Sequence, residues 1–374
     1  MFVSALPARY LTATRPQLFT IVRRFFTNRS LTVSRAIANL NGSPMTAPTI
    51  PSYPVVDDTP RSFGAARTRG DDVFRAMTSG AGIFVFLLIG SIAAFLIING
   101  WPAIAKVGLG DFLTNTRWQP VGLKPHYGVL GLLSYTALVS GLALVIAVPI
   151  SLSTAIVINE YAPKRLRSFL TGLVDLLAAF PSIIFGLWGL FYVMPNLNGT
   201  ANWLSSHLGW IPLFANDTGL ATNSVFMAMW VLAIMIVPIT TSVVREVLSQ
   251  VPRDQCEAAL GLGGTRWGMV RSVILPFGRS GIIGGSMLGL GRALGETVAI
   301  ALILSPKFDP QVSIMKPGGS TVASTIFNEF NEADLSHREA LMAIGLALFV
   351  LTLIVNSFAR AVVSRSKASR ASSR

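Results

Sequence analysis

The chain has 374 residues, of which 52% are hydrophobic and only 13% charged, with a formal net charge of +13. Its apolar runs are long enough to cross a bilayer several times, and most basic residues beyond the N-terminal region flank those runs, so membrane topology explains the charge better than nucleic-acid binding. The single cysteine, Cys256, excludes an internal disulfide and a cysteine metal cluster, and the three histidines lie far apart in predicted loops, so we expect no metal site.

Residues 1–70 differ in composition from the rest and are predicted to be a mostly disordered, basic cytoplasmic extension. They contain no acidic residue before Asp57 and six arginines up to Arg35. Residues 16–26 place apolar side chains on one helical face beside two arginines, so they could lie on an anionic membrane surface, although they are too short to span it. Two alternatives stay open. The segment could be an organelle transit peptide, or the start codon could be assigned too far upstream, with Met45 as the true first residue; we favour the transit peptide least.

Residues 71–374 form the predicted transmembrane domain, an all-α unit with six membrane-spanning helices. Each predicted span is a mostly apolar run close to or above the ~20 residues that a helix needs to cross a bilayer. The expected spans are 81–99, 130–158, 169–194, 224–243, 277–305 and 340–358. Lysine and arginine gather in the loops after the second and fourth spans and in the C-terminal tail, so the positive-inside rule predicts that both termini are cytoplasmic.

The third predicted span contains a charged residue, Asp175, six residues before Pro181. Ionisable side chains inside membranes often mark transport paths, so Asp175 is a candidate for a substrate path. Pro181 and Pro238 are expected to kink the third and fourth spans, either beside a pathway or as a packing bend.

Segment 250–276, between the fourth and fifth spans, is predicted to be a cytoplasmic hairpin of two short helices. Pro252 suits a first helical turn, and Gly263 can adopt the left-handed conformation that ends the first helix. Thr265 can cap the second helix, which Pro276 is expected to close. A compact knob of this kind can dock in a partner's groove; the alternative is an ordinary solvated loop.

The fifth predicted span carries two opposite charges near its centre. Arg292 lies about 22 Å along a helix that rises ~1.5 Å per residue, and Glu296 follows four residues later. In a continuous helix both share one face with Gly281, Gly285 and Gly289, a spacing typical of close helix packing. A charge at the centre of a lipid-exposed helix costs ~2.5 kcal/mol or more, so this face is expected to point into protein or a wet cavity. The two charges form either part of a transport path or a structural ion pair.

The sequence contains no nucleotide-binding loop. None of its six lysines follows a glycine, as a P-loop requires. No pair of a nucleophile and a base is apparent, so we predict no catalytic residue. The alternative is a membrane enzyme that uses Asp175 and Glu296 as paired carboxylates. We disfavour it because Arg292 would keep Glu296 ionised. We therefore expect this chain to bind no cofactor, and any ATP and Mg²⁺ to be used by a separate subunit.

Two stretches resemble known families. Glu257-Ala258-Ala259, Gly263 and the run VILP at 273–276 resemble the EAA motif of ABC importer permeases at every spacing, with valine where that family usually has isoleucine. The segments VDLLAAFPSIIFGLWGLFYVMP and LPFGRSGIIGGSMLGLGRALGETVAIALIL resemble, more narrowly, the C-type permease subunit (PstC) family of the bacterial high-affinity phosphate importer. The likeness runs from about residue 75 to the C-terminus and leaves the first 70 residues unmatched.

The resemblance implies the six-helix fold of type I ABC importer permeases, in a multi-pass protein of the bacterial cytoplasmic (inner) membrane. It implies that Arg292 and Glu296 take part in phosphate passage and that the hairpin docks on an ATPase. The implied docking residues are Glu257, Ala258, Ala259, Gly263 and Pro276.

The same resemblance implies a set of partners and no nucleic acid. They are a second permease of PstA type in a heterodimer, an ABC ATPase dimer of PstB type on the cytoplasmic side, a periplasmic or lipid-anchored phosphate-binding protein of PstS type, and membrane lipid. The alternatives are a permease for another small oxyanion and an ATP-independent channel or carrier.

Overall fold

The computed structural model describes residues 69–120, 125–217, 219, 221–309 and 311–371. The predicted disorder of the N-terminal extension and its amphipathic segment 16–26 lie outside the described residues. Within the described part, all regular structure is helical apart from one two-stranded sheet, in agreement with the predicted all-α class.

Five helices of the described chain are long and apolar enough to cross a membrane. They are α2 (Arg69–Val107), α4 (Leu130–Ile156, continued by the π-turn η2, Val157–Tyr161), α8 (Val225–Ser249), α11 (Leu275–Leu294, with the turns before it) and α14 (Leu335–Ala371). A helix satisfies its backbone N–H and C=O groups internally, which the bilayer interior requires of any spanning segment. The structure thereby confirms the first, second, fourth and sixth predicted spans.

The third predicted span, 169–194, is not one straight helix. α5 (Lys164–Ala178) ends before Pro181, and α6 (Ser182–Trp188), the π-turn η3 (Gly189–Val193) and α7 (Met194–Leu208) continue at 91° to it. Proline lacks a backbone donor and clashes with the preceding turn, and the kink expected at Pro181 is accordingly a full break. By contrast, α8 continues through Pro238 without a break.

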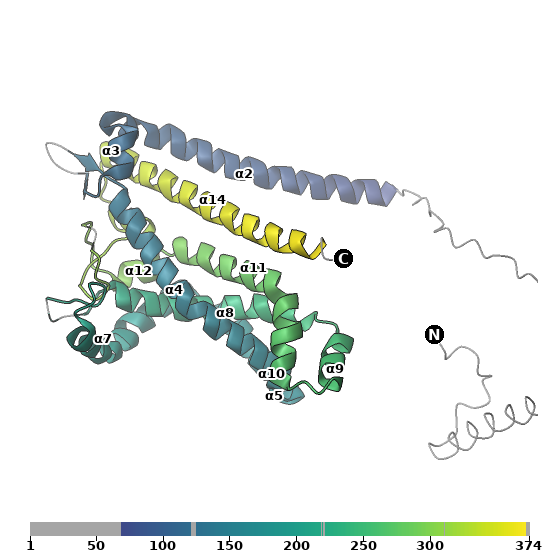
Figure 1. Ribbon diagram of the computed structural model, residues 1–374. Helices are drawn as coiled ribbons and strands as arrows, with labels where there is room; N and C mark the ends of the chain where they lie inside the picture. The colour runs from purple at the N-terminus through teal and green to yellow at the C-terminus, as the bar shows by residue number, and fades with distance from the viewer. Residues whose placement is uncertain (1–68, 121–124, 218, 220, 310, 372–374) are drawn as a thin grey trace, which may run out of the picture. The chain divides into compact units, whose positions relative to one another are not determined.

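The fifth predicted span, 277–305, has different ends in the structure. α10 (Arg266–Met269), the π-turn η4 (Val270–Ile274) and α11 follow one another directly, so the helix runs through Pro276 instead of starting after it. Prolines and π-turns are both common sites of helix bends, and Figure 1 shows the helical path turning between α10 and α11. The prediction that Pro276 closes the hairpin is therefore wrong. At its other end α11 stops before Gly295, and a separate short helix, α12 (Val298–Ile303), follows.

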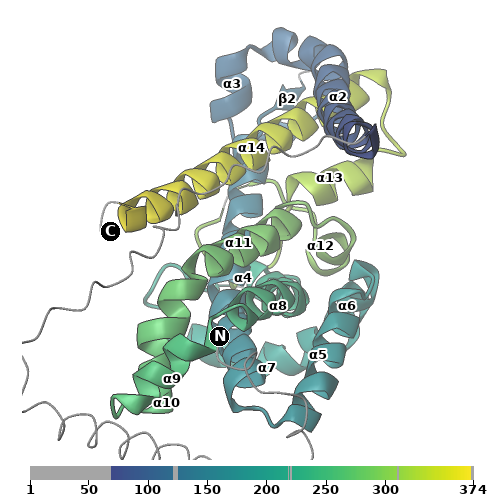
Figure 2. The ribbon, with the colours of Figure 1, turned by 90° about the vertical axis from the view of Figure 1, so that its right-hand side faces the viewer.

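α4, α8 and α11 form the centre of the bundle, as both ribbon views show (Figure 2). Their buried faces include Ala143 and Ala147 on α4 and Leu232 and Ile236 on α8. In the most apolar window of α8, 67% of the residues are buried, against 0% in α2. α8 is therefore a core helix, whereas α2 presents its apolar side chains outward, as a lipid-facing helix does.

α2 and α14 cross close to the end of the bundle that carries α3, and they diverge from there (Figure 2). A Cβ on Gly100 of α2 would lie 2.8 Å from the backbone N of Ala343 in α14. Helix association in membranes often depends on small residues that let two backbones approach closely, and Gly100 permits this crossing.

Short elements gather at the end of the bundle away from α9 (Arg253–Gly261) and α10 (Figure 1). They include α3 (Leu109–Thr114), the antiparallel pair β1 (Trp118–Gln119) and β2 (His126–Tyr127), and α13 (Val322–Glu329). Glu329 Oε2 accepts hydrogen bonds from Trp118 Nε1 at 3.1 Å and pairs with His337 Nε2 at 2.8 Å, which joins β1, α13 and α14.

The prediction that the histidines lie in loops is wrong. His126 lies in β2, His207 in α7, and His337 is buried in the first turns of α14. Asp334 starts that helix by accepting a hydrogen bond from the backbone N of His337 at 2.8 Å, a local cap that hydropathy does not register. The described residues contain no group of three or more His, Cys, Asp or Glu side chains placed to hold a metal ion.

Candidate functional site

Arg292 occupies the last turn of α11 and is only partly exposed. Its Nε atom is buried and makes no hydrogen bond, and no carboxylate of the described chain lies within ion-pair distance of it. A guanidinium has five N–H donors and no acceptor, so a buried Nε without a partner is an unsatisfied donor. The side chain can therefore bind an acceptor that the chain itself does not provide.

Glu296 lies in the break after α11 and not on that helix. The residue is buried, with 8% exposure, and its Oε1 accepts a hydrogen bond from the backbone N of Ala299 at 3.2 Å. A side-chain oxygen that accepts from a first-turn N–H stabilises the start of a helix. Glu296 therefore begins α12, and no ion pair joins it to Arg292 among the described side chains.

The prediction that Arg292 and Glu296 share one helical face is thus wrong, and the alternative of a structural ion pair loses its basis with it. Glycine is a poor helix former because it loses the most backbone freedom on ordering, and Gly291 and Gly295 enclose the turn that carries Arg292. The apolar run continues beyond this break as α12, so hydropathy alone does not reveal it.

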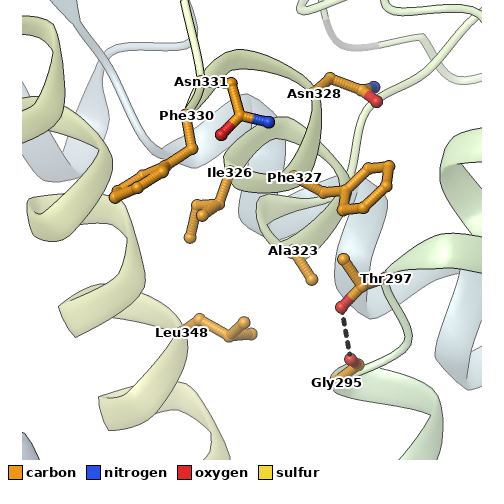
Figure 3. A pocket seen from close by; sticks show the side chains of 9 residues that line it. All are labelled: Gly295, Thr297, Ala323, Ile326, Phe327, Asn328, Phe330, Asn331 and Leu348. Carbon is orange, nitrogen blue, oxygen red and sulfur yellow. Dashed lines mark hydrogen bonds between the residues drawn. The ribbon is translucent and has the colours of Figure 1, made fainter. Parts of the chain in front are cut away.

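The break between α11 and α12 borders a pocket of about 690 Å³. Figure 3 labels its lining residues, which are Gly295, Thr297, Ala323, Ile326, Phe327, Asn328, Phe330, Asn331 and Leu348. Ile326 of α13 and Leu348 of α14 point into it, and Thr297 Oγ1 donates a hydrogen bond to the carbonyl of Gly295 at 3.1 Å. The lining contains no charged side chain, so we do not assign this pocket to the path of an anion.

Gly281, Gly285 and Gly289 of α11 face α8. A Cβ on Gly281 would lie 2.4 Å from Val247 Cγ1, and one on Gly289 would lie 2.6 Å from Ile236 Cγ2. Real Cβ atoms do not tolerate such contacts, so glycine permits the close approach of the two helices along this ladder. Arg292 continues the same side of α11 one turn beyond Gly289.

Asp175 lies on α5 and is exposed. Ser242 Oγ of α8 donates a hydrogen bond to its Oδ1 at 2.8 Å, and Arg245 of α8 approaches its Oδ2 at 3.7 Å. Asp175 therefore ties α5 to α8. No hydrogen bond or ion pair within the described chain joins it to Arg292 or Glu296.

The α9–α10 hairpin has the predicted turn and cap. Gly263 has φ +85°, the left-handed conformation that commonly follows the end of a helix, and this ends α9. Thr265 Oγ1 accepts a hydrogen bond from the backbone N of Gly268 at 3.1 Å and so caps α10. A Cβ on Gly264 would lie 2.5 Å from the carbonyl oxygen of Ala259, so the turn requires glycine there as well.

One side of the α9–α10 hairpin is exposed and partly apolar. Leu262 is 90% exposed and Trp267 is 59% exposed, and Glu257 and Ala258 are exposed beside a half-buried Ala259. Large apolar side chains exposed among polar ones are typical of protein–protein contacts.

The opposite side of the α9–α10 hairpin packs on the bundle. Cys256 and Val270 join an apolar cluster with Ile156 of α4 and Val244 of α8. Arg253 of α9 forms an ion pair with Glu160 of η2. Sequence reasoning missed Glu160, although a single acidic residue in the basic loop after the second span is a signal that could have identified it.

Residues 147–368 match the family described as "Binding-protein-dependent transport system inner membrane component". The chain is 43% identical over 298 residues to phosphate transport system permease protein PstC 2 of Mycobacterium tuberculosis, an alignment that covers 79% of this chain and 92% of the relative. It is 42% identical over 299 residues to phosphate transport system permease protein PstC of Haemophilus influenzae, covering 79% of this chain and 93% of the relative.

Among solved structures, the chain is similar to a bacterial alginate ABC transporter solved in complex with an alginate pentasaccharide-bound periplasmic protein. The TM-score is 0.53 at 18% identity, over 80% of this chain and 98% of that chain, and the likeness shows the fold of type I ABC importer permeases. With a family match over more than half of its length and relatives above 40% identity covered almost completely, the chain belongs to the binding-protein-dependent transport system inner membrane components and, within them, to the PstC family of phosphate transport system permease proteins.

Proposed function

We propose that this chain is the permease subunit that passes inorganic phosphate across the bacterial cytoplasmic membrane in an ATP-driven ABC importer. The observation that carries the proposal is Arg292, whose buried Nε on a central helix has no acceptor in the described chain. Phosphate near neutral pH is a small, largely dianionic ion, and a guanidinium can donate to two of its oxygens at once. The names of the relatives in M. tuberculosis and H. influenzae support this choice of substrate.

Release of the anion is as necessary as binding, and we assign this role to Glu296. An ion path must bind its substrate weakly enough to let it leave, and a carboxylate near the arginine lowers the affinity for an anion. Because the Glu296 carboxylate bonds to the start of α12, it leaves the guanidinium of Arg292 available to the substrate. Asp175, paired with Arg245 between α5 and α8, is the proposed charged pair further along the path.

The α9–α10 hairpin is the proposed docking site of an ABC ATPase dimer of PstB type, which hydrolyses ATP with Mg²⁺. Its exposed Leu262 and Trp267, together with Glu257 of the EAA motif, support this assignment. A second permease of PstA type completes the heterodimer, and a phosphate-binding protein of PstS type delivers the substrate from outside. In this arrangement the hairpin and both chain termini are cytoplasmic, and lipid surrounds the outward faces of helices such as α2.

Phosphate uptake by cells that lack other phosphate importers tests the role of Arg292. Arg292→Lys keeps the charge but loses the planar guanidinium, which can donate to two phosphate oxygens at once. We therefore expect most of the uptake to be lost while the complex still assembles in the membrane. Arg279→Lys is the matched control, because Arg279 is exposed near the other end of α11. Normal uptake by Arg292→Lys would contradict the proposal.

Two further measurements separate the alternatives. Purification of the complex in mild detergent is expected to recover an ATPase and a second permease with this chain. Uptake that persists without the ATPase would indicate a channel or carrier, and uptake of sulfate in preference to phosphate would indicate a different oxyanion.

A further inference from the structure

The contact between α8 and α11 contains a second buried polar group that the proposed function does not use. Thr240 of α8 is 0% exposed, and its Oγ1 has no hydrogen-bond partner in the described chain. Buried hydroxyls in proteins are usually hydrogen-bonded, often to the carbonyl four residues earlier in the same helix. Thr136 and Ser140 on the neighbouring α4 make such bonds, at 2.7 and 2.6 Å, whereas the Thr240 hydroxyl does not.

The Thr240 hydroxyl lies against the backbone of α11 at Gly289. A Cβ built on Gly289 would lie 2.7 Å from Thr240 Oγ1, so any larger residue there would displace the hydroxyl. Arg292 follows Gly289 by three residues, about 4.5 Å along the axis of an α-helix, on the same side of α11. Two unsatisfied buried groups, the Nε of Arg292 and the hydroxyl of Thr240, are therefore about one helical turn apart along the same contact.

We infer that the Thr240 hydroxyl is a second contact of the anion bound by Arg292, an inference that rests on the proposed role of Arg292. A guanidinium only donates hydrogen bonds, whereas a hydroxyl both donates and accepts. Phosphate near neutral pH carries bare oxygens that accept and a protonated oxygen that donates. Threonine can therefore bond to either kind of oxygen, which a second arginine could not do.

Thr241 provides an internal control beside Thr240. It is also 0% exposed, and its Oγ1 also has no partner among the described residues. Successive residues of a helix point about 100° apart, so Thr241 points in a different direction, and it is Thr240 whose hydroxyl lies closest to the Gly289 position. A role that depends on the contact with α11 belongs to Thr240 alone, whereas a general effect of buried hydroxyls in α8 would affect both.

The test compares Thr240→Val, Thr240→Ser and Thr241→Val in the phosphate uptake assay. Valine keeps the shape of threonine and removes a hydroxyl that is unsatisfied in the folded chain, so it should not destabilise the protein. We expect Thr240→Val to lower the maximal rate of uptake by about tenfold or more, the loss of one hydrogen bond to a charged ligand. Thr240→Ser should retain most of the uptake, Thr241→Val should match the unaltered protein, and the membrane level of the complex should be equal in all three.

Two outcomes would overturn the inference. One is normal uptake by Thr240→Val, and the other is an equal loss in Thr240→Val and Thr241→Val with a falling level of the complex, which would indicate a packing role. Arg292→Lys, measured in the same cells, separates this inference from the proposed function. Full uptake by Arg292→Lys would contradict the function itself, whereas a loss in Arg292→Lys with normal uptake by Thr240→Val would reject only the role of Thr240.

Discussion

Arg253 at the start of α9 forms an ion pair with Glu160 in the π-turn at the end of α4, with Nη1 and Oε2 3.6 Å apart and the Glu160 side chain only 9% exposed. The pair joins the α9–α10 hairpin to a central helix of the bundle. Because the Glu160 carboxylate is largely buried, the position of the hairpin depends in part on a charge that has little access to water.

Arg253→Glu should weaken this attachment, since it places two carboxylates together. We expect ATP-driven phosphate uptake to fall by a factor of about two to five, which corresponds to roughly 0.4–1 kcal/mol for a pair with one exposed partner. Combining Arg253→Glu with Glu160→Arg should restore much of the uptake, because the attraction is kept with the charges exchanged. A double variant no better than the single one would show that the pair does not position the hairpin.

Gly263→Pro should abolish uptake while leaving the protein in the membrane. The pyrrolidine ring fixes φ near −65°, whereas Gly263 has φ +85°, so the turn of the α9–α10 hairpin cannot form. Uptake and ATPase stimulation are the measurements. Gly261→Ala is the matched control, because a Cβ at Gly261 meets nothing within 4 Å, and it should behave normally. Normal uptake by Gly263→Pro would argue against the hairpin as the docking element.

Exchange of the two charges by Arg292→Glu with Glu296→Arg should not rescue uptake. No ion pair joins these residues in the described structure, so the exchange has no attraction to conserve and moves the arginine out of α11. Each single reversal should be equally inactive, with complex levels in the membrane measured in parallel. An active double variant would restore the hypothesis of a structural ion pair.

Glu296→Gln and Glu296→Ala should differ in stability. Glutamine keeps an oxygen that can accept the hydrogen bond from the backbone N of Ala299, whereas alanine leaves that N–H without its acceptor. We expect alanine to lower the free energy of unfolding by about 0.5–2 kcal/mol, the usual effect of losing a helix cap, and glutamine to cost less. Thermal unfolding of the purified complex measures this, and equal transition temperatures would contradict the capping role.

Reporter fusions test the orientation of the chain. A reporter fused after Asn198 should report the periplasm, and one fused after Gly264 should report the cytoplasm, because the basic loops are expected on the cytoplasmic side. The opposite pattern would overturn the proposed topology and, with it, the docking of an ATPase on the α9–α10 hairpin.

The sequence predicts the parts of this fold that depend on local chemistry. Long apolar runs predict the centres of α2, α4, α8 and α14, because a single segment that crosses a bilayer can satisfy its backbone hydrogen bonds internally only as a helix. The Gly263 turn and the Thr265 cap are equally local, and the structure confirms both.

The remaining features of the site depend on contacts that periodicity does not encode. Hydropathy continues unchanged past Gly295, so the break that separates Glu296 from Arg292 is invisible to it. Glu160 meets Arg253, and Asp175 meets Arg245, only after distant parts of the chain have packed together. The unsatisfied hydroxyl of Thr240 is likewise defined by its position against Gly289, which no sequence pattern specifies.

From Arg266 to Leu294 the chain stays helical for 29 residues, through the π-turn η4 and Pro276, so the docking segment and the segment that carries Arg292 are joined by a bent helix and not by a loop. A flexible loop between them would absorb a displacement, whereas a bent helix can pass part of it on to α11. Under the proposed docking, a tilt of α11 by roughly 5° about Leu275, acting over the roughly 26 Å to Arg292, moves that end of the helix by about 2 Å. That displacement is large enough to make or break a hydrogen bond, so a movement of the docked hairpin can reach the proposed anion contact through the α10–α11 bend.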